Sequence, residues 1–329
     1  MNDAFTPNAF KITTLTAAIN KIPFQPTRIG DMGIFTASGI NTLDCAIEES
    51  NGTLQLVEVK PRNAPGKQIS DAPRKVRTFR VPHLPESSSV MADEVQGVRA
   101  FGSDGSQTEV LQVRINERLA DMRRNLDYTL EQHRVAAIMG NFYDANGGTT
   151  SLFTEFAVAQ QTQAMNLHKT NTSYFREQLF NVRKKVRVGL GGIPGSDGSL
   201  RVLCGDAFWA ALLEDKDIKS TFLNQQQAAE LRGTVTDSVR IGSATFEWYE
   251  GTAEVNLGSD AYVIPESVPG LFITRYAPAN YAETVNSIGL PFYAKGAPMK
   301  FNKGWEMEAQ SNPLNLCTRP AAIVKLTIA

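Results

Sequence analysis

The feature that most constrains the fold is one apolar stripe that continues from residue 106 to residue 140. Its members recur at steps of three and four residues, the spacing of one face of an α-helix. They are Leu111, Ile115, Leu119, Met122, Leu126, Leu130, His133 and Ala137. Ser106 and Glu109 form a capping box at the start, and Gly140 stops the pattern. Such a helix would be about 50 Å long at ~1.5 Å per residue, so we predict a mechanical spine over 106–140.

The opposite face of this segment is charged. Its charged residues are Arg114, Glu117, Arg118, Arg123, Arg124 and Glu131. A coiled coil is the competing interpretation, but the run holds only about four heptads and lacks regular pairing charges. His133 lies on the apolar stripe, which favours a hydrogen-bonded core or interface histidine over a metal ligand.

The segment before the spine predicts an arm and a hairpin. Residues 1 to about 35 mix prolines with scattered hydrophobic residues, a pattern typical of an arm that needs another surface to lie on. Leu43, Cys45 and Ile47 then alternate with polar neighbours. Asn51-Gly52 supplies a turn, and the alternation resumes over residues 54–59, which predicts a β-hairpin.

Residues 60–82 form the one strong local charge feature of the chain. The basic residues are Lys60, Arg62, Lys67, Arg74, Lys75, Arg77 and Arg80, against the single acid Asp71. Little in this stretch is apolar before the strand-like residues 76–81, so we predict a long two-stranded loop that reaches for a neighbouring subunit with an acidic surface. A solvated loop is one alternative. Contact with nucleic acid is another, although Phe79 is the only aromatic residue available for base stacking.

The rest of the chain alternates short strands and helices. We predict strands over residues 151–159, 200–203, 239–249, 262–275 and 305–309, and at 323–328, where an apolar chain end is expected to join a sheet. Helices are predicted from Ser173, striped by Phe175, Leu179, Val182 and Val186, and after Asp206 as a cap. A glycine-rich loop covers 189–198, and Asp144-Ala-Asn-Gly147 is interpreted as a turn.

Composition and motifs give no indication of catalysis. The 329 residues are 42% hydrophobic with a net charge of −1, which excludes any global argument for nucleic-acid or membrane binding. The glycine-rich loop has proline where the dinucleotide fingerprint needs its third glycine, and no metal-ligand spacing occurs, so we expect no cofactor and no metal.

Cys45, Cys204 and Cys317 are predicted to be small buried residues in a reducing cytoplasm. No apolar run of 18 residues and no signal-peptide pattern occurs.

A series of phrases in order along the chain resembles the lambda-like major capsid proteins of tailed bacteriophages, the phage capsid protein E family. They are Leu15-Thr-Ala-Ala-Ile-Asn20, Arg77-Thr-Phe-Arg-Val-Pro82-His83, Glu94-Val-Gln-Gly-Val-Arg-Ala-Phe-Gly102, Glu131-Gln-His-Arg134, Asp144-Ala-Asn-Gly147, Val202-Leu-Cys-Gly-Asp-Ala-Phe208 and Lys303-Gly-Trp305. The resemblance covers essentially the whole chain, and its weight lies in this collinearity.

The resemblance implies an α+β fold of the Hong Kong 97-type major capsid class. Residues 1–53 would be the N-terminal arm and first hairpin strand, and 54–82 the extended loop lying across an adjacent subunit. Residues 83–189 would form the peripheral domain with the spine over 106–140, and 190–290 the axial domain. Residues 291–329 would return to the sheet of the peripheral domain.

The implied function is that of a structural shell subunit, not an enzyme, which self-assembles into an icosahedral head around double-stranded DNA. Its partners would be further copies of itself in hexameric and pentameric capsomers, with portal, scaffolding and possibly decoration proteins, and weak non-specific DNA contact. It would reside in the virion capsid, and in the host cytoplasm during assembly. The alternatives are an encapsulin-like compartment shell and a soluble α+β enzyme.

Overall fold

The predicted spine is present as the helix α4 (Gln107–Ile138), which runs for 32 residues in the computed structural model. The structure describes residues 12–22, 27–50, 74–95, 107–168, 170–191, 198–219 and 238–329, the last range without positions 253, 255 and 267. Ser106, and with it the predicted capping box, lies outside them. At the other end Gly140 adopts a left-handed φ of 84°, and a side chain there would collide with the ring of Phe153. The helix therefore stops where the sequence predicts.

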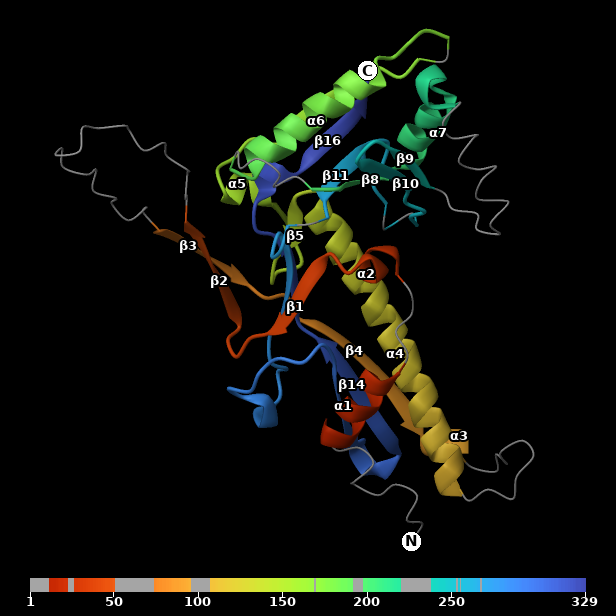
Figure 1. Cartoon of the computed structure of the whole chain (residues 1–329). Coiled ribbons are helices and arrows are strands. Elements are labelled where there is room, and N and C mark those ends of the chain that lie inside the picture. Colours follow the sequence, from red (N-terminus) through yellow and green to blue (C-terminus); the bar gives the residue numbers. More distant parts are fainter. Residues whose placement is uncertain are drawn as a thin grey trace, which may run out of the picture.

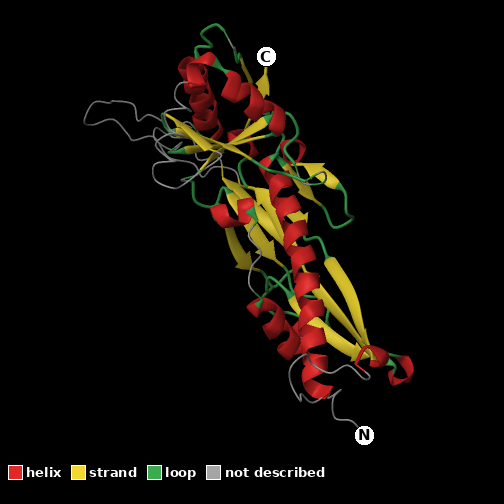
Figure 2. Cartoon of the chain, turned by 90° about the vertical axis from the view of Figure 1, so that its right-hand side faces the viewer, coloured by secondary structure: helices red, strands yellow, loops and turns green. Residues whose placement is uncertain are grey.

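The apolar stripe of α4 joins two hydrophobic cores. Ile115, Leu119, Met122 and Leu126 are buried in the smaller core, and Ile138 belongs to the larger one. One continuous helix thus starts at one end of an elongated molecule and runs into the larger core, as Figures 1 and 2 show. The predicted mechanical role of α4 agrees with this placement.

The charged back of α4 is not wholly exposed, since Arg123 is 8% and Glu131 4% accessible. Arg123 forms an ion pair with Asp127 at 2.8 Å, donates to the carbonyl of Ile19 at 3.1 Å, and lies over the ring of Phe292. The segment before α4 covers this part of its polar face. A helical pattern alone could not reveal that cover, since it comes from residues about a hundred positions away.

The smaller core lies beneath a three-stranded antiparallel sheet. This sheet has the order β13–β14–β4 and consists of β4 (Leu84–Met91), β13 (Tyr293–Pro298) and β14 (Gly304–Ser311). Met307 and Ala309 of β14 are fully buried, as the predicted alternation requires. The helix α1 (Ile12–Lys21) packs on β13, where Thr16 exchanges two hydrogen bonds with the backbone of Ala294. The sequence predicted that the N-terminal arm needs a surface to lie on, and α1 finds that surface on β13 of its own chain.

A second three-stranded sheet lies beside the C-terminal half of α4. It has the order β1–β12–β15 and consists of β1 (Phe35–Gly39), β12 (Phe272–Tyr276) and β15 (Pro313–Cys317). β1 runs parallel to β12, whereas β15 runs antiparallel to it. The short helix α2 (Arg28–Met32) precedes β1 and contacts α4.

The largest sheet contains six strands in the order β7–β16–β11–β8–β10–β9. They are β7 (Gln161–Met165), β8 (Leu200–Cys204), β9 (Ser238–Ile241), β10 (Ala244–Trp248), β11 (Ala261–Pro265) and β16 (Val324–Ile328). The helices α6 (Phe175–Gly189) and α7 (Asp206–Glu214) pack against it (Figure 1). The predicted stripe of α6 is buried. Asp206 is the first residue of α7 rather than its cap, and its carboxylate accepts a hydrogen bond from Trp248 Nε1 at 2.8 Å.

The final strand, which the sequence analysis expects to return to the sheet of the peripheral domain, lies in the six-stranded sheet. β16 lies between β7 and β11 in the six-stranded sheet and pairs with both. An apolar terminal strand needs partners on both edges, but its own residues do not specify which strands supply them. The sheet therefore combines strands from three of the segments that the resemblance defined.

Between α4 and β7 the chain forms a small hairpin and one helical turn instead of the strand predicted over 151–159. β5 (Asn141–Tyr143) pairs with β6 (Thr149–Ser151) through the predicted turn, in which Asp144 Oδ1 accepts from two backbone amides. α5 (Leu152–Glu155) follows. Leu152 and Phe156 are four positions apart and both buried, so helical spacing competes here with the strand-like composition.

The remaining elements are short. They are α3 (Ala92–Val95) and the 3-10 turns η2 (Ala282–Thr284), η3 (Lys300–Asn302) and η4 (Pro320–Ala322). All three cysteines are free and buried, as predicted. The alternation of helices with antiparallel and mixed sheets confirms the α+β class.

Candidate assembly surfaces

Residues 74–80 of the basic segment form one strand of a two-stranded ribbon that stands away from the body (Figure 1). β2 (Asp44–Ser50) pairs along its whole length with β3 (Arg74–Arg80), from Asp44 opposite Arg80 to Ser50 opposite Arg74. The sequence analysis paired the first strand with residues 54–59. Those residues and the turn at Asn51-Gly52 lie outside the described part of the chain, in which β2 pairs with β3. β2 therefore pairs with a strand that is distant in the sequence, which the turn at Asn51-Gly52 did not predict.

Four of the seven predicted contact residues lie on β3, namely Arg74, Lys75, Arg77 and Arg80. Lys60, Arg62 and Lys67 lie outside the described residues. Lys75 is exposed, and Arg80 forms a half-exposed ion pair with Asp44 at 3.6 Å. The guanidinium of Arg77 lies 4.8 Å from the ring centroid of Phe156. Arg77 and Arg80 therefore contact their own chain, and Lys75 is available to another.

The base of the ribbon is fixed by aromatic packing. Phe79 is buried, and its ring meets Phe142 edge-on at 5.2 Å between centroids and stacks on Phe156 at 6.1 Å. Val76, three residues nearer the tip, is 59% exposed. The ribbon is thus anchored at one end and presents apolar and cationic side chains further out.

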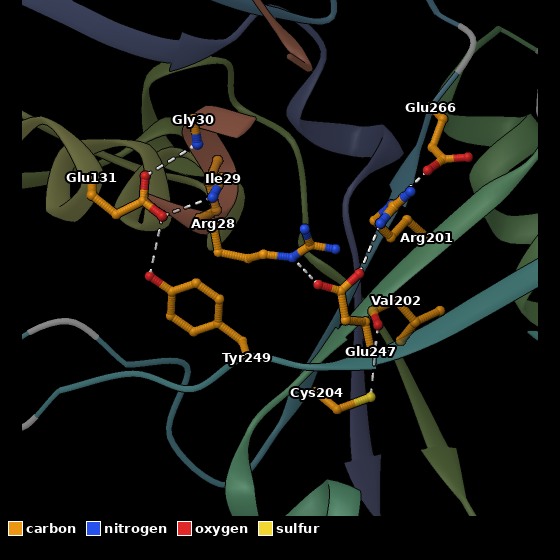
Figure 3. A network of polar contacts seen from close by, with 10 residues as sticks. All are labelled: Arg28, Ile29, Gly30, Glu131, Arg201, Val202, Cys204, Glu247, Tyr249 and Glu266. Carbon is orange, nitrogen blue, oxygen red and sulfur yellow. Dashed lines mark hydrogen bonds and ion pairs between the residues drawn. The ribbon is translucent and has the colours of Figure 1, made fainter. Parts of the chain in front are cut away.

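A second feature is a polar network that attaches the N-terminal segment to both halves of the molecule (Figure 3). Glu131 on α4 accepts hydrogen bonds from the backbone amides of Ile29 at 2.8 Å and Gly30 at 3.3 Å. It also accepts one from the hydroxyl of Tyr249 at 3.4 Å. Burial and the neighbouring Glu131 carboxylate raise the pKa of Tyr249, so this hydroxyl stays a donor.

Glu247 on β10 is the second centre of the network. Its carboxylate forms ion pairs with Arg28 of α2 and, at 2.7 Å, with Arg201 of β8. Arg201 also pairs with Glu266 at 2.5 Å. Burial alone would raise the pKa of Glu266, but hydrogen bonds from Arg201 and Ser199 outweigh it, so its pKa lies below the usual value. Of these groups Glu247 is the buried one, and a buried charge is stable only when paired; here it has two cationic partners.

The network fixes α2 between the spine and the six-stranded sheet. α2 bonds to Glu131 through its backbone and to Glu247 through Arg28, and Tyr249 closes the link from the sheet to the spine. None of the five charged residues of the network was predicted from the sequence to belong to a site; they are Arg28, Glu131, Arg201, Glu247 and Glu266. Their partners come from separate segments, so the sequence carried no local signal for them.

A hollow of about 1020 Å³ lies beside α6 and is lined by Glu177 and Asp217 among others. Asp217 accepts hydrogen bonds from the amide and hydroxyl of Ser173, just before α6. Burial alone would raise the pKa of Asp217, but these bonds lower it on balance, so the carboxylate is held ionised as a structural cap. Among the residues that the structure describes, no three His, Cys, Asp or Glu side chains lie close enough together to bind a metal ion.

No helix among the described ranges is both long and apolar enough to cross a membrane.

Comparisons with known proteins agree on one class. The family model of the phage major capsid protein E matches residues 11–328. The chain is 23% identical to a major capsid protein of Salmonella phage Felix O1, over 96% of this chain and 95% of the relative. It is 25% identical to that of Pseudomonas phage KPP10, with 97% of each covered.

Solved structures share the fold. The capsid of Myoviridae phage XM1 matches with a TM-score of 0.50 and 11% identity, over 94% of this chain and 95% of that chain. The capsid of an empty GTA particle gives a TM-score of 0.54 and 10% identity, over 93% and 92%. At these identities the likeness establishes the fold, which is the capsid fold that the sequence predicted.

Proposed function

The chain belongs to the phage major capsid protein E family, and from this membership we propose that it is a structural subunit that assembles with copies of itself into the closed icosahedral head of a phage. The observation that carries the proposal is the family match over residues 11–328 together with a capsid fold along the whole chain. The family favours the phage head over the compartment shell and over the soluble enzyme.

Within the head, the extended loop over residues 54–82 contacts an adjacent subunit. The ribbon that stands away from the body and the exposed Lys75 support this role. The contact residues proposed are Lys60, Arg62, Lys67, Arg74, Lys75, Arg77 and Arg80. Contacts between exposed charges are individually weak, so a misplaced subunit dissociates, whereas many contacts together hold a completed shell.

The domain assignment is also a proposal. Residues 190–290 would form the axial domain around β8–β11, and β7 and β16 belong to the same sheet. The peripheral domain would comprise α4 and the β13–β14–β4 sheet.

The subunits would form hexameric and pentameric capsomers in the host cytoplasm. Their partners would be portal, scaffolding and possibly decoration proteins, and they would make weak, non-specific contact with packaged double-stranded DNA. No catalytic step belongs to this function.

The test is expression of the chain alone, followed by negative-stain electron microscopy and sedimentation velocity at low and moderate salt. Closed shells or ring-shaped capsomers are expected. A compact monomer under every condition, with the 54–82 segment protected from protease, would contradict the proposal and return attention to the enzyme alternative.

A further inference from the structure

Resting on the shell function above, we propose that the tip of the β13–β14 hairpin, with Phe301 at its apex, inserts into an apolar groove on a neighbouring copy of this chain. The groove lies between α1 and residues 283–293.

The tip displays an aromatic ring in a well-defined turn. Phe301 is 90% exposed and has a left-handed φ of 63°, which a bulky side chain rarely adopts. The turn is closed by hydrogen bonds from the Met299 amide to the Gly304 carbonyl and from the Asn302 amide to the Met299 carbonyl, both 3.0 Å. The Lys303 carbonyl accepts from the amide of Ala92 at 3.0 Å. The ring is thus held outward by bonded backbone, as a residue that meets a partner would be.

The groove has a volume of about 600 Å³ and a mainly apolar lining that includes Ile12, Ala17, Ile288, Leu290 and Tyr293. Ile288 is 70% and Leu290 44% exposed. Their loop is fixed, because the Gly289 amide donates to the Ile40 carbonyl at 2.9 Å and the Leu290 amide to Tyr293 Oη at 2.8 Å. Large aliphatic side chains held at the surface beside a groove are typical of a protein interface.

The ring cannot fill the groove of its own chain. Tyr293, at the start of β13, lines the groove, whereas the tip follows Pro298 at the other end of the strand. Six strand residues at ~3.4 Å each separate the two by roughly 17 Å or more. Because β13 is paired to β14 from Tyr293 to Pro298, it cannot fold back. A contact between the tip and this groove must therefore join two copies, in a head-to-tail arrangement of the kind that closes rings.

Charge favours the same pairing. Glu283 is the one charged side chain among the described residues that line the groove, and Lys295 binds it at 2.6 Å on the exposed rim. Lys300 and Lys303 flank Phe301 at the tip. The ring would supply the buried area, and the half-exposed Glu283 carboxylate, already paired with Lys295, would accept a further ion pair from a lysine of the tip.

Cross-linking tests the contact directly. The three native cysteines are buried, so Phe301→Cys and Ile288→Cys add the accessible thiols. A short bismaleimide applied to assembled shells of the double variant should link the thiols of different copies. The products should be dimers and higher oligomers, which form a ladder of bands on a denaturing gel. The matched control joins Phe301→Cys with Val188→Cys, which is 63% exposed on α6 and should give no ladder.

Two single variants test its contribution to assembly. Phe301→Asn removes the ring and suits the left-handed backbone, so the isolated subunit should be at least as stable as the unchanged chain. Ala17→Lys places a cation in the groove, facing the lysines of the tip. Each should raise the concentration needed for half-maximal assembly at least tenfold.

The outcomes separate this inference from the proposed function. Shells of the unchanged chain, with neither ladder nor effect of Phe301→Asn, would overturn the inference alone. An intrachain cross-link between Ile288→Cys and Phe10→Cys would assign the groove to the chain's own N-terminal segment and also overturn it. An unchanged chain that never oligomerises would overturn both.

Discussion

Glu131 and Arg123 illustrate how a residue's environment differs from what its type suggests. Both are on the polar face of α4, yet both are buried because α1 and α2 lie over that face. Burying an unpaired charge raises the free energy of the folded state, so the surrounding groups must supply partners. The Ile19 carbonyl is one partner of Arg123, and the amides of α2 are partners of Glu131. These two charged side chains thus bind backbone groups of the N-terminal segment and fix its position on α4.

His133 should make the stability of the unassembled subunit depend on pH. It is buried against Tyr143, with ring centroids 4.3 Å apart, and burial lowers its pKa from 6.5 to about 4. Between these values the unfolded chain binds a proton that the folded chain does not, so stability falls as the pH drops from about 6.5 to about 4. The loss should be about 3 kcal/mol, from 1.36 kcal/mol per pH unit.

Urea unfolding at pH 7, 5.5 and 4.5 measures this dependence. The variant His133→Gln should lose that part of the pH dependence, whereas His168→Gln, which removes an exposed histidine, should keep it. Equal slopes in both variants would show that His133 is not the group responsible.

At the scale of elements, α2 is the piece whose position depends most on single side chains. It has only five residues, which is too few for a helix to be stable by itself. Its backbone bonds to Glu131 and its Arg28 pairs with Glu247. Local sequence could not predict it, because its stability comes from residues on α4 and β10.

The variant Glu131→Gln should therefore release α2. The amide keeps one acceptor but turns a donor toward backbone amides, so we expect a loss of about 2 to 3 kcal/mol in unfolding free energy. Trypsin should then cut after Lys21 or Arg28 sooner than in the unchanged chain. The control is Glu117→Gln, whose exposed ion pair with Arg114 is worth about 0.5 kcal/mol or less. Equal cleavage rates for the two variants would argue against the proposed anchor.

At the scale of the whole molecule, α4 connects two cores, and the β2–β3 ribbon reaches outward from the body (Figure 1). A subunit built in this way has a rigid axis and separate contact surfaces. If the extended loop binds a neighbour mainly through charge, then assembly must weaken as salt screens that contact.

Replacing Lys60, Arg62 and Lys67 together by Gln should reduce assembly and its salt dependence. Three exposed pairs at roughly 0.5 kcal/mol each would shift the half-assembly concentration about tenfold. Light scattering at low and moderate salt measures the shift. The control replaces the exposed Lys184, Lys216 and Lys219, which changes the net charge equally and should leave assembly near normal. An equal effect of both triples would indicate general repulsion rather than a specific contact.

The sequence by itself determined the elements whose signals are local. The 3-4 spacing along 107–138 produces α4, Gly140 ends it, and alternation produces β14 and β16, because side-chain periodicity and backbone φ are set by neighbouring residues. Only the tertiary structure decided which strands pair and which charges are buried. β2 pairs with β3, β16 joins the six-stranded sheet, and Glu131 and Glu247 hold α2, since pairing and desolvation depend on groups that meet only when the chain has folded.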